Sequence, residues 1–158
     1  MVEANQHVDI AQLGRQVREL ADRSEITDLI TRLGLWLDEK RFDEDRSIFT
    51  EDVTAQTPGG SVRGIDPVAE QARRNHADFE HTQHVITNTL IDLDGDRATI
   101  GANLIATFVH HDGAPEPRFA LGERYRFEAA RTPRGWRLSR VQVTPLWRSS
   151  SRNGVSQA

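Results

Sequence analysis

The stretch QHVITNTLIDLDGD, residues 83–96, decides how this chain folds. Apolar and β-branched residues run through it, and Asp94-Gly95 is a two-residue sequence typical of a tight β-hairpin turn. The stretch therefore predicts a long strand that turns directly into an antiparallel partner. It also contains His84, whose imidazole can exchange a proton near neutral pH.

Downstream of this stretch the sequence keeps a period of two, which is typical of strands joined by hairpins. His111-Asp-Gly113 and Thr132-Pro-Arg-Gly135 are two further turn sequences. They divide the second half of the chain into predicted strands at 83–93, 96–110, 118–130 and 135–147. The second half therefore predicts a long-stranded antiparallel sheet.

Upstream, the apolar residues recur at helical spacing. A short N-terminal helix within residues 1–21 carries the stripe Ile10, Leu13, Val17 and Leu20, and we expect this face to dock on the domain or on a neighbouring subunit. Asp22 or Ser24 can cap a second helix. Its apolar face consists of Ile26, Leu29, Ile30, Leu33 and Leu37. This second helix is the strongest helical pattern in the chain.

Shorter elements lie between this helix and the sheet. The sequence predicts a helix near 43–49, a strand near 53–57 that ends at Pro58-Gly-Gly60, and a helix that begins at Asp66-Pro67 and runs toward Phe79. Helices followed by antiparallel strands define an α+β domain over residues 22–148, with a curved sheet wrapped around the 26–37 helix. The polar residues 149–158 predict a disordered tail.

The composition bounds the function. A chain of 158 residues is one domain with room for a core and a cavity, and a net charge of −4 gives no reason to expect nucleic acid or an anionic membrane as partner. There is no cysteine, and no apolar run reaches the roughly 20 residues that span a bilayer. The polar first residues do not resemble a signal peptide, so we expect a cytoplasmic protein.

Two side chains could form an acid/base pair. Asp38 ends the second helix, and His84 shares strand parity with the apolar residues Ile86 and Leu90. An imidazole oriented by a carboxylate is the arrangement that general acid/base catalysis requires. The alternatives are a solvated carboxylate at a helix end and a histidine hydrogen-bonded to the backbone where its strand begins.

Several motifs together resemble the SnoaL-like branch of the nuclear transport factor 2-like superfamily, which includes scytalone dehydratase, ketosteroid isomerase and polyketide cyclases. The resemblance covers residues 20–148. It rests on Asp38-x-x-x-Phe-Asp43, Ile48-Phe-Thr-Glu-Asp52, Val62-Arg-Gly64, His84-x-x-x-Asn88, Asp94-Gly-Asp96, Arg124-Tyr-Arg126, Gly135-Trp136 and Trp147. It implies a conical α+β barrel in which a curved antiparallel sheet and helices enclose an internal pocket.

The resemblance also implies a site. Scytalone dehydratase has a Tyr-Asp pair where this chain has Leu37-Asp38, a histidine at the position of His84, and a second histidine that aligns approximately with Asn103. The ketosteroid isomerase base falls in the run that ends at Pro58, where Gln56 and Thr57 cannot take a proton from carbon. The resemblance therefore implies Asp38 and His84 as catalytic residues. The substrate-binding candidates are Asn103, Tyr125, Trp36 and Trp147, although Tyr125 and the two tryptophans could equally be core or pocket wall.

These observations favour an acid/base enzyme of dehydratase, cyclase or isomerase type that needs no cofactor. Its substrate would be a hydrophobic, oxygenated small molecule such as a polyketide, aromatic or terpenoid intermediate. A small-molecule carrier and a structural subunit of the same fold are the alternatives. His76, His81 and His84 match no standard zinc spacing, so we expect no metal. An open curved sheet leaves an apolar face, so we expect a homodimer or higher homo-oligomer.

Overall fold

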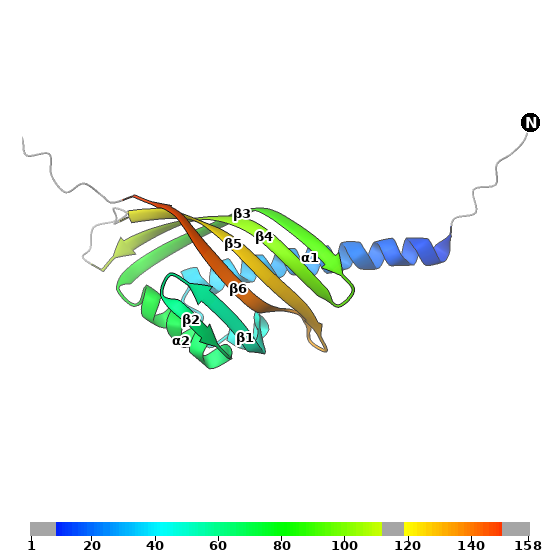
Figure 1. Cartoon of the computed structure of the whole chain (residues 1–158), viewed down its shortest axis with the longest axis horizontal. Helices are drawn as coiled ribbons and strands as arrows, with labels where there is room; N and C mark the ends of the chain where they lie inside the picture. The colour runs from blue at the N-terminus through cyan, green and yellow to red at the C-terminus, as the bar shows by residue number, and fades with distance from the viewer. Residues whose placement is uncertain (1–8, 112–118, 150–158) are drawn as a thin grey trace, which may run out of the picture.

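The computed structural model describes residues 9–111 and 119–149 as two α-helices packed against one six-stranded sheet (Figure 1). In chain order the elements are α1 (Ile10–Asp38), the 3₁₀ turn η1 (Asp45–Ser47), β1 (Phe49–Thr57), β2 (Gly60–Arg63), α2 (Ile65–His76), β3 (Phe79–Asp94), β4 (Arg97–His110), β5 (Phe119–Thr132) and β6 (Gly135–Arg148). The predicted α+β class is confirmed.

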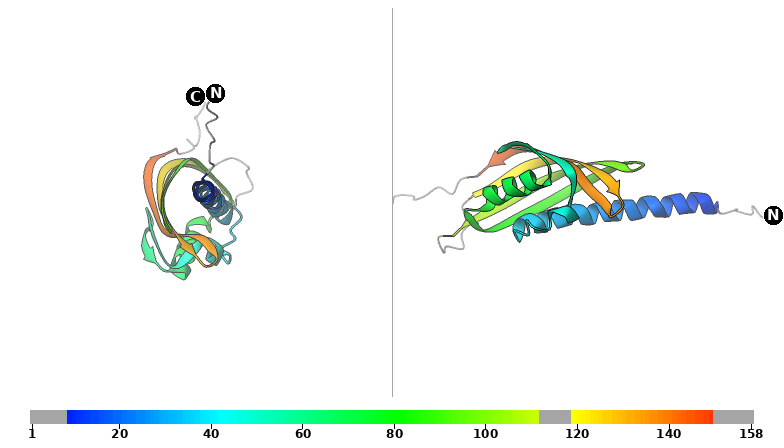
Figure 2. Two further views of the ribbon diagram at one scale, coloured as in Figure 1. Left: turned by 90° about the vertical axis from the view of Figure 1, so that its right-hand side faces the viewer. Right: turned by 90° about the horizontal axis from the view of Figure 1, so that it is seen from below.

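The sheet is curved, open and mixed. Its strand order is β2-β1-β6-β5-β4-β3, and it wraps around α1 as Figure 2 shows. The hairpin-linked strands β3 to β6 are antiparallel as predicted. The expectation of a wholly antiparallel sheet is wrong at one place, because β1 pairs with β6 in parallel. No hairpin joins these two strands, so turn sequences could not reveal their relative direction.

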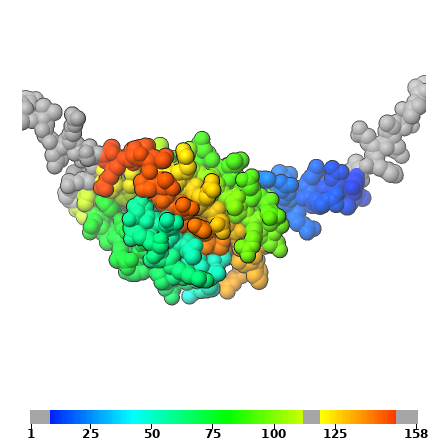
Figure 3. Space-filling view, viewed as in Figure 1, coloured from blue at the N-terminus to red at the C-terminus, as the bar shows by residue number. Residues whose placement is uncertain are grey.

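The helix α1 is one continuous helix of 29 residues, not the two that the sequence predicts. Neither proline nor glycine interrupts the join between the two predicted segments, and Asp22 does not cap a helix there. The cap of α1 is Asp9, whose carboxylate accepts a hydrogen bond of 3.0 Å from the backbone N–H of Ala11. The start of α1 extends beyond the sheet, as the space-filling view in Figure 3 shows.

The apolar stripe on that extension is exposed. Ile10, Leu13, Val17 and Leu20 are 50% exposed or more. The expectation that this stripe docks on the chain's own domain is therefore wrong, because the helix runs straight past the end of the sheet. A neighbouring subunit remains as the possible partner for it.

Asp22 ties the middle of α1 to the sheet. Its carboxylate is buried and accepts hydrogen bonds from Trp136 Nε1 at 3.2 Å and from the guanidinium of Arg131 at 2.6 Å. The hydrogen bond from Arg131 holds the pKa of Asp22 below its usual range against the effect of burial. One turn along the helix, Glu25 accepts from the backbone N–H of Trp136 at 2.9 Å. Gly135 makes this approach possible, since its φ of +93° is left-handed and a Cβ there would collide with Glu25.

A bulge in β3 changes which side chains face the helix. Asn88 has a φ of +54°, and the pairing of β3 with β4 shifts between Thr87 and Leu90. His84 and Ile86 therefore lie on the concave face, while Leu90 is 68% exposed on the convex face. Simple strand parity placed Leu90 with His84, and the extra residue of the bulge is the reason why this was wrong.

The smaller elements differ from their predictions mainly at their ends. The helix predicted near 43–49 is only the short turn η1, β1 begins earlier than predicted, and α2 ends at His76 rather than near Phe79. The strand β2 was not predicted because it has four residues. The predicted turn at residues 111–113 lies largely outside the described residues, as does the predicted tail apart from Ser149. No described helix is both long and apolar enough to cross a bilayer.

The concave face is packed at one end and hollow at the other. The packed end contains fully buried side chains around the Asp22 contacts: Ile26, Leu29, Ile100, Phe127, Trp136 and Leu138. Toward the end of α1, the small side chain of Ala106 on β4 lines a hollow beneath the helix. A dense core thus supports one wall of a cavity.

Replacing Asp22 by alanine should destabilise the protein by about 1–3 kcal/mol, since it leaves the buried indole N–H of Trp136 without its acceptor. Asp28→Ala, an exposed carboxylate on the same helix, is the matched control and should change the free energy of unfolding by less than about 0.5 kcal/mol. Urea unfolding followed by circular dichroism measures both. Equal effects of the two variants would contradict the assigned role of Asp22.

Candidate active site

Asp38 and His84 form a hydrogen-bonded pair where the end of α1 meets β3. His84 Nδ1 lies 2.6 Å from Asp38 Oδ1. The backbone N–H of His84 donates to both carboxylate oxygens at 3.0 and 3.1 Å, and the hydroxyl of Thr82 donates to Oδ1 at 3.2 Å. One carboxylate therefore fixes both the backbone and the ring of His84.

These contacts set the charge of Asp38 and the tautomer of His84. Burial alone would raise the pKa of Asp38, but the hydrogen bonds from His84 and Thr82 outweigh it and hold the pKa below its usual range. An ionised carboxylate can only accept hydrogen bonds, so Nδ1 of His84 carries a proton. In the neutral ring Nε2 then holds a free lone pair. This is the arrangement of a general base.

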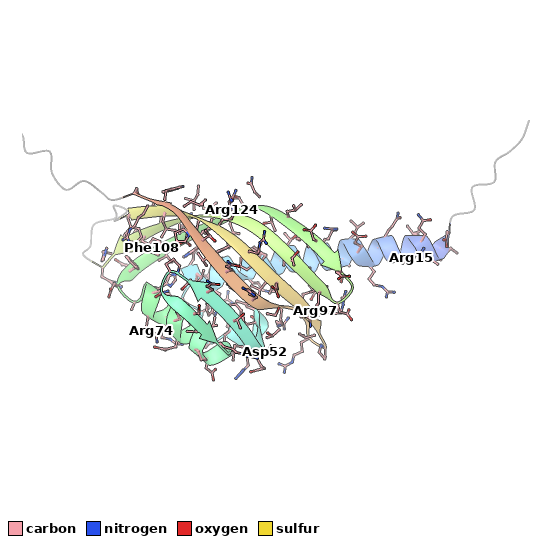
Figure 4. The ribbon with its side chains drawn as sticks, viewed as in Figure 1. Arg15, Asp52, Arg74, Arg97, Phe108 and Arg124 are labelled. Carbon is pink, nitrogen blue, oxygen red and sulfur yellow. The ribbon has the colours of Figure 1, made fainter. Side chains whose placement is uncertain are left out.

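The ring of His84 lines a cavity of about 440 Å³ between α1, α2 and the concave face of the sheet. The wall is mostly apolar and aromatic, with Leu33, Trp36, Leu37, Phe49, Val68, Phe79, Leu104, Phe108, Phe119, Leu121, Val141 and Val143 among its residues. Figure 4 labels Phe108, which stacks on Phe119 with ring centroids 4.6 Å apart. A cavity of this size and lining suits a small hydrophobic molecule.

Glu123 is a titratable residue of the cavity that the sequence analysis missed as a site candidate. It lies on β5, points into the cavity and is half-buried. Burial raises the pKa of its carboxyl, although the nearby His84 acts in the opposite sense. The alternation Glu123, Tyr125, Phe127 along one strand was the signal that could have found it, because a carboxylate there shares its face with two aromatic rings.

His76 is a second imidazole beside the pair. It ends α2, its ring centroid lies 5.4 Å from that of His84, and its Nδ1 lies 2.7 Å from the carbonyl of Ala72. Burial lowers the pKa of His76, so its neutral form is favoured. The contact with a carbonyl requires Nδ1 to donate, which leaves Nε2 of His76 as an acceptor. The sequence analysis considered His76 only as a metal ligand.

Of the four substrate-binding candidates, two line the cavity and two do not. Trp36 and Tyr125 are buried in its wall, and burial raises the pKa of Tyr125, which stays a neutral phenol. Asn103 is exposed on the convex face, next to Arg124 of β5, which Figure 4 labels. Its assignment to the site is wrong, because the inward positions of β4 are the even-numbered residues on either side of it.

Trp147 also lies outside the cavity. Its indole is 48% exposed and covers Gly122, whose Cβ, if it had one, would collide with the ring. Gly122 points away from the cavity because its neighbours Leu121 and Glu123 point into it. The assignment of Trp147 to the substrate site is therefore wrong, and the indole forms part of the convex surface instead.

The three histidines considered for a metal do not come together. His81 has a side chain that is 74% exposed, whereas His76 and His84 lie inside the cavity. Within residues 9–111 and 119–149, no group of three or more histidine or acidic side chains could hold a metal ion.

Comparisons with known proteins agree with this fold. Residues 18–142 match the SnoaL-like domain, so the chain belongs to that family. An uncharacterized protein of Mycobacterium tuberculosis is 27% identical over 126 residues, which are 78% of this chain and 85% of the relative.

Two solved structures show the same architecture. A scytalone dehydratase-like protein of Novosphingobium aromaticivorans has a TM-score of 0.75 at 18% identity and covers 89% of this chain and 97% of its own. A hexachlorocyclohexane dehydrochlorinase has a TM-score of 0.78 at 17% identity and covers 90% of this chain and 97% of its own. At these identities the likeness is one of fold alone. A third structure, an ntf2-like protein with a cystatin-like fold from Novosphingobium aromaticivorans, has a TM-score of 0.73 at 25% identity and covers 89% of this chain and 92% of its own.

The raised pKa of Glu123 makes stability depend on pH. A carboxyl with a folded-state pKa above its unfolded value of about 4.3 stabilises the fold at lower pH, and this stabilisation is lost as the pH rises through the folded pKa. Glu123→Gln, which stays neutral, should therefore gain melting temperature relative to the wild type between pH 4 and pH 8. The other titratable or charged groups lining the cavity are His76, His84, Tyr125 and Arg148, and they are the same in both proteins.

Glu128→Gln is the control for this measurement, because Glu128 lies on the same strand and is exposed on the convex face. Its melting temperature should track that of the wild type across the pH range. A constant difference between Glu123→Gln and the wild type at all pH values would contradict the burial of the Glu123 charge.

Proposed function

We propose that this protein is an acid/base enzyme of the dehydratase type that acts on a hydrophobic, oxygenated small molecule. The observation that carries the proposal is the 2.6 Å contact between His84 Nδ1 and Asp38 Oδ1 at the wall of an apolar cavity. A carboxylate behind an imidazole favours the protonated ring that forms when the base accepts a proton. The apolar wall strengthens every polar interaction made inside the cavity.

The reaction begins at a carbon next to a carbonyl. Nε2 of His84 removes the proton from that carbon, and Asp38 stabilises the imidazolium that results. The electron pair moves toward the carbonyl oxygen, where the neutral phenol of Tyr125 can donate a hydrogen bond. General acid/base catalysis of this kind contributes about 10²–10⁴ in rate. The carbon–oxygen bond to a hydroxyl on the adjacent carbon then breaks, which gives a dehydration.

The names of two neighbours are consistent with this chemistry. A dehydratase eliminates water and a dehydrochlorinase eliminates hydrogen chloride, and both reactions remove a proton and a leaving group from adjacent carbons. The likeness in each case is one of fold, so it supports the proposal without assigning the reaction to this chain. Cyclisation and isomerisation begin with the same proton removal and remain alternative outcomes at the same residues.

A small-molecule carrier and a structural subunit are the competing functions. A carrier needs a cavity but has no use for an imidazole held against an ionised carboxylate. A structural subunit needs neither the cavity nor the pair, and side chains would be expected to fill the space inside its curved sheet. The cavity therefore argues against a structural subunit, and the ordered Asp38–His84 pair favours an enzyme over a carrier.

Replacement of His84 tests the proposal directly. With a panel of β-hydroxy ketones and polyketide-like enols as substrates, His84→Gln should lower kcat by about 10² or more, because glutamine can keep a hydrogen bond to Asp38 but cannot accept the proton. Asp38→Asn should lower kcat as well, since it removes the charge that stabilises the imidazolium. His81→Ala, an exposed histidine on the same strand, is the control.

Two results would count against the mechanism. One is a folded His84→Gln variant with wild-type turnover, and the other is a loss from His81→Ala as large as that from His84→Gln. Turnover should also survive treatment with EDTA, since the proposed steps use only side chains of this chain.

We also propose that a second copy of the chain covers the convex face of the sheet. Val85 on β3, Ile105 on β4 and Trp147 on β6 form an exposed apolar row across the sheet, with Gly122 under the indole. A row at the centre of one face is self-complementary about a two-fold axis. The exposed stripe on the start of α1 provides a second apolar surface that residues 9–111 and 119–149 leave uncovered.

Ile105→Lys should shift the protein toward a monomer in sedimentation velocity, because a charge at the centre of an apolar interface cannot be desolvated cheaply. Thr99→Lys places the same charge on the same strand and face but away from the row, and it should leave the sedimentation coefficient unchanged. A wild-type protein that sediments as a monomer at micromolar concentration would refute the proposed assembly.

A further inference from the structure

Glu123 is the titratable group of the cavity that the proton-removal step does not use. It points inward from β5, and the wall around it includes the apolar side chains of Leu121, Tyr125 and Val143. Within the described residues Glu123 makes neither a salt bridge nor a side-chain hydrogen bond, unlike Asp22 and Asp38. A half-buried carboxyl without a partner is costly to keep, and such groups are candidates for a role in chemistry.

The strand register places Glu123 on the same concave face as His84, with β4 between them. His84 pairs with Ala106 of β4, and Glu123 pairs with Leu104, the next inward residue on that strand. The two residues therefore lie two strands and one inward step apart, which is about 12 Å between Cα atoms on a flat sheet. The sheet is curved, as Figure 2 shows. Both side chains line the cavity on its concave side, so their ends converge relative to their Cα atoms.

The cavity wall between the two side chains is formed by β4. Ala106 and Leu104 of β4 lie between His84 and Glu123, and Ala106 is a small residue that leaves the cavity open there. A bound molecule against this wall would have the imidazole on one side and the carboxyl on the other. The remaining titratable or charged groups that line the cavity are His76 on α2, Tyr125 on β5 and Arg148 on β6, whose guanidinium lies 3.9 Å from the centre of the Phe119 ring. Its neutral polar lining residues are Thr57, Gln71 and Asn75.

We propose that Glu123 is the general acid that protonates the leaving oxygen of a β-hydroxy carbonyl substrate while His84 acts as the base. This inference rests on the proposed function and deepens it, since it names the substrate class and the second proton donor. Both groups line the same cavity from strands that flank β4, so a single bound substrate can contact the base at one carbon and the acid at the oxygen on the adjacent carbon.

The step balances in protons and electrons. His84 Nε2 takes the α-proton, the electrons of that C–H bond form the carbon–carbon double bond, and the carbon–oxygen bond to the hydroxyl breaks with its electron pair on oxygen. The carboxylic acid of Glu123 gives its proton to that oxygen, so water leaves. His84 is then protonated and Glu123 ionised, and transfer of one proton between them, through the released water, restores both.

The nature of the leaving group explains why an acid is needed. Hydroxide is a poor leaving group whose departure is much faster when an acid protonates it, whereas acetate departs readily without a proton. The apolar wall favours the neutral carboxyl, and burial raises the pKa of Glu123 above its ordinary value. An apolar substrate that excludes water from the cavity strengthens this effect.

A pair of probes that differ only in the leaving group tests the inference. 4-Hydroxy-4-phenylbutan-2-one and its 4-acetoxy ester eliminate to the same conjugated ketone, which is followed by its ultraviolet absorbance. With full-length protein, Glu123→Gln should lower kcat for the hydroxy ketone by about 10² or more and change kcat for the acetate by less than about 10-fold. Glu123→Asp, which keeps an acid on a shorter arm, should recover part of the lost rate. Glu128→Gln is the matched control on the same strand.

The two probes distinguish the acid role of Glu123 from the base role of His84. His84→Gln should slow both probes, because proton removal is needed whichever group leaves. Equal losses from Glu123→Gln on both probes, or no loss on either, would overturn the acid role while leaving the base intact. Loss from Glu123→Gln without loss from His84→Gln would overturn the proposed function instead. Failure of the wild type to convert either probe would overturn both for this substrate class.

Discussion

The whole molecule depends on the way α1 is held inside the curved sheet. Two carboxylates on that helix, Asp22 and Asp38, each accept hydrogen bonds from groups on strands, Asp22 from Trp136 and Arg131 and Asp38 from His84 and Thr82. They are sixteen positions apart in the sequence, which is about 24 Å along a helix. The helix is therefore fixed at two separated points, and neither its rotation nor its sliding is free.

These two attachments divide the interior into regions of different character. Around Asp22 the space is filled by Phe127, Trp136 and aliphatic side chains, so this end behaves as an ordinary core. Next to the Asp38–His84 contact lies the cavity, whose lining on β4 includes the small side chain of Ala106. The packed core and the cavity thus lie at different ends of one sheet. A costly group such as the unpartnered Glu123 carboxyl therefore lies away from the part of the interior that stabilises the fold.

The sequence predicted those parts of the fold that local patterns determine. The Asp94-Gly95 hairpin and the apolar stripe from Ile26 to Leu37 both indicate their elements directly, and Asp38 and His84 were placed correctly as neighbours by resemblance. The parallel pairing of β1 with β6 could not be predicted, because no short connection encodes it. The bulge at Asn88 was also hidden, and it is the reason why parity failed at Leu90. For the site, Asn103 and Trp147 were misplaced because an alignment by resemblance does not fix which face of a strand a residue takes.

Asp38 and His84 differ in their exposure to solvent, and this difference affects how a proton can leave the site. The side chain of His84 is 4% exposed, whereas that of Asp38 is 22% exposed and so meets bulk water. The imidazole thus lies between the apolar cavity on its Nε2 side and a partly exposed carboxylate on its Nδ1 side. Besides transfer to Glu123, the ring therefore has a second route by which to lose a proton, to the solvent by way of Asp38. In an enzyme of the proposed kind, charge can then re-equilibrate with the solvent while the cavity is still occupied by its ligand.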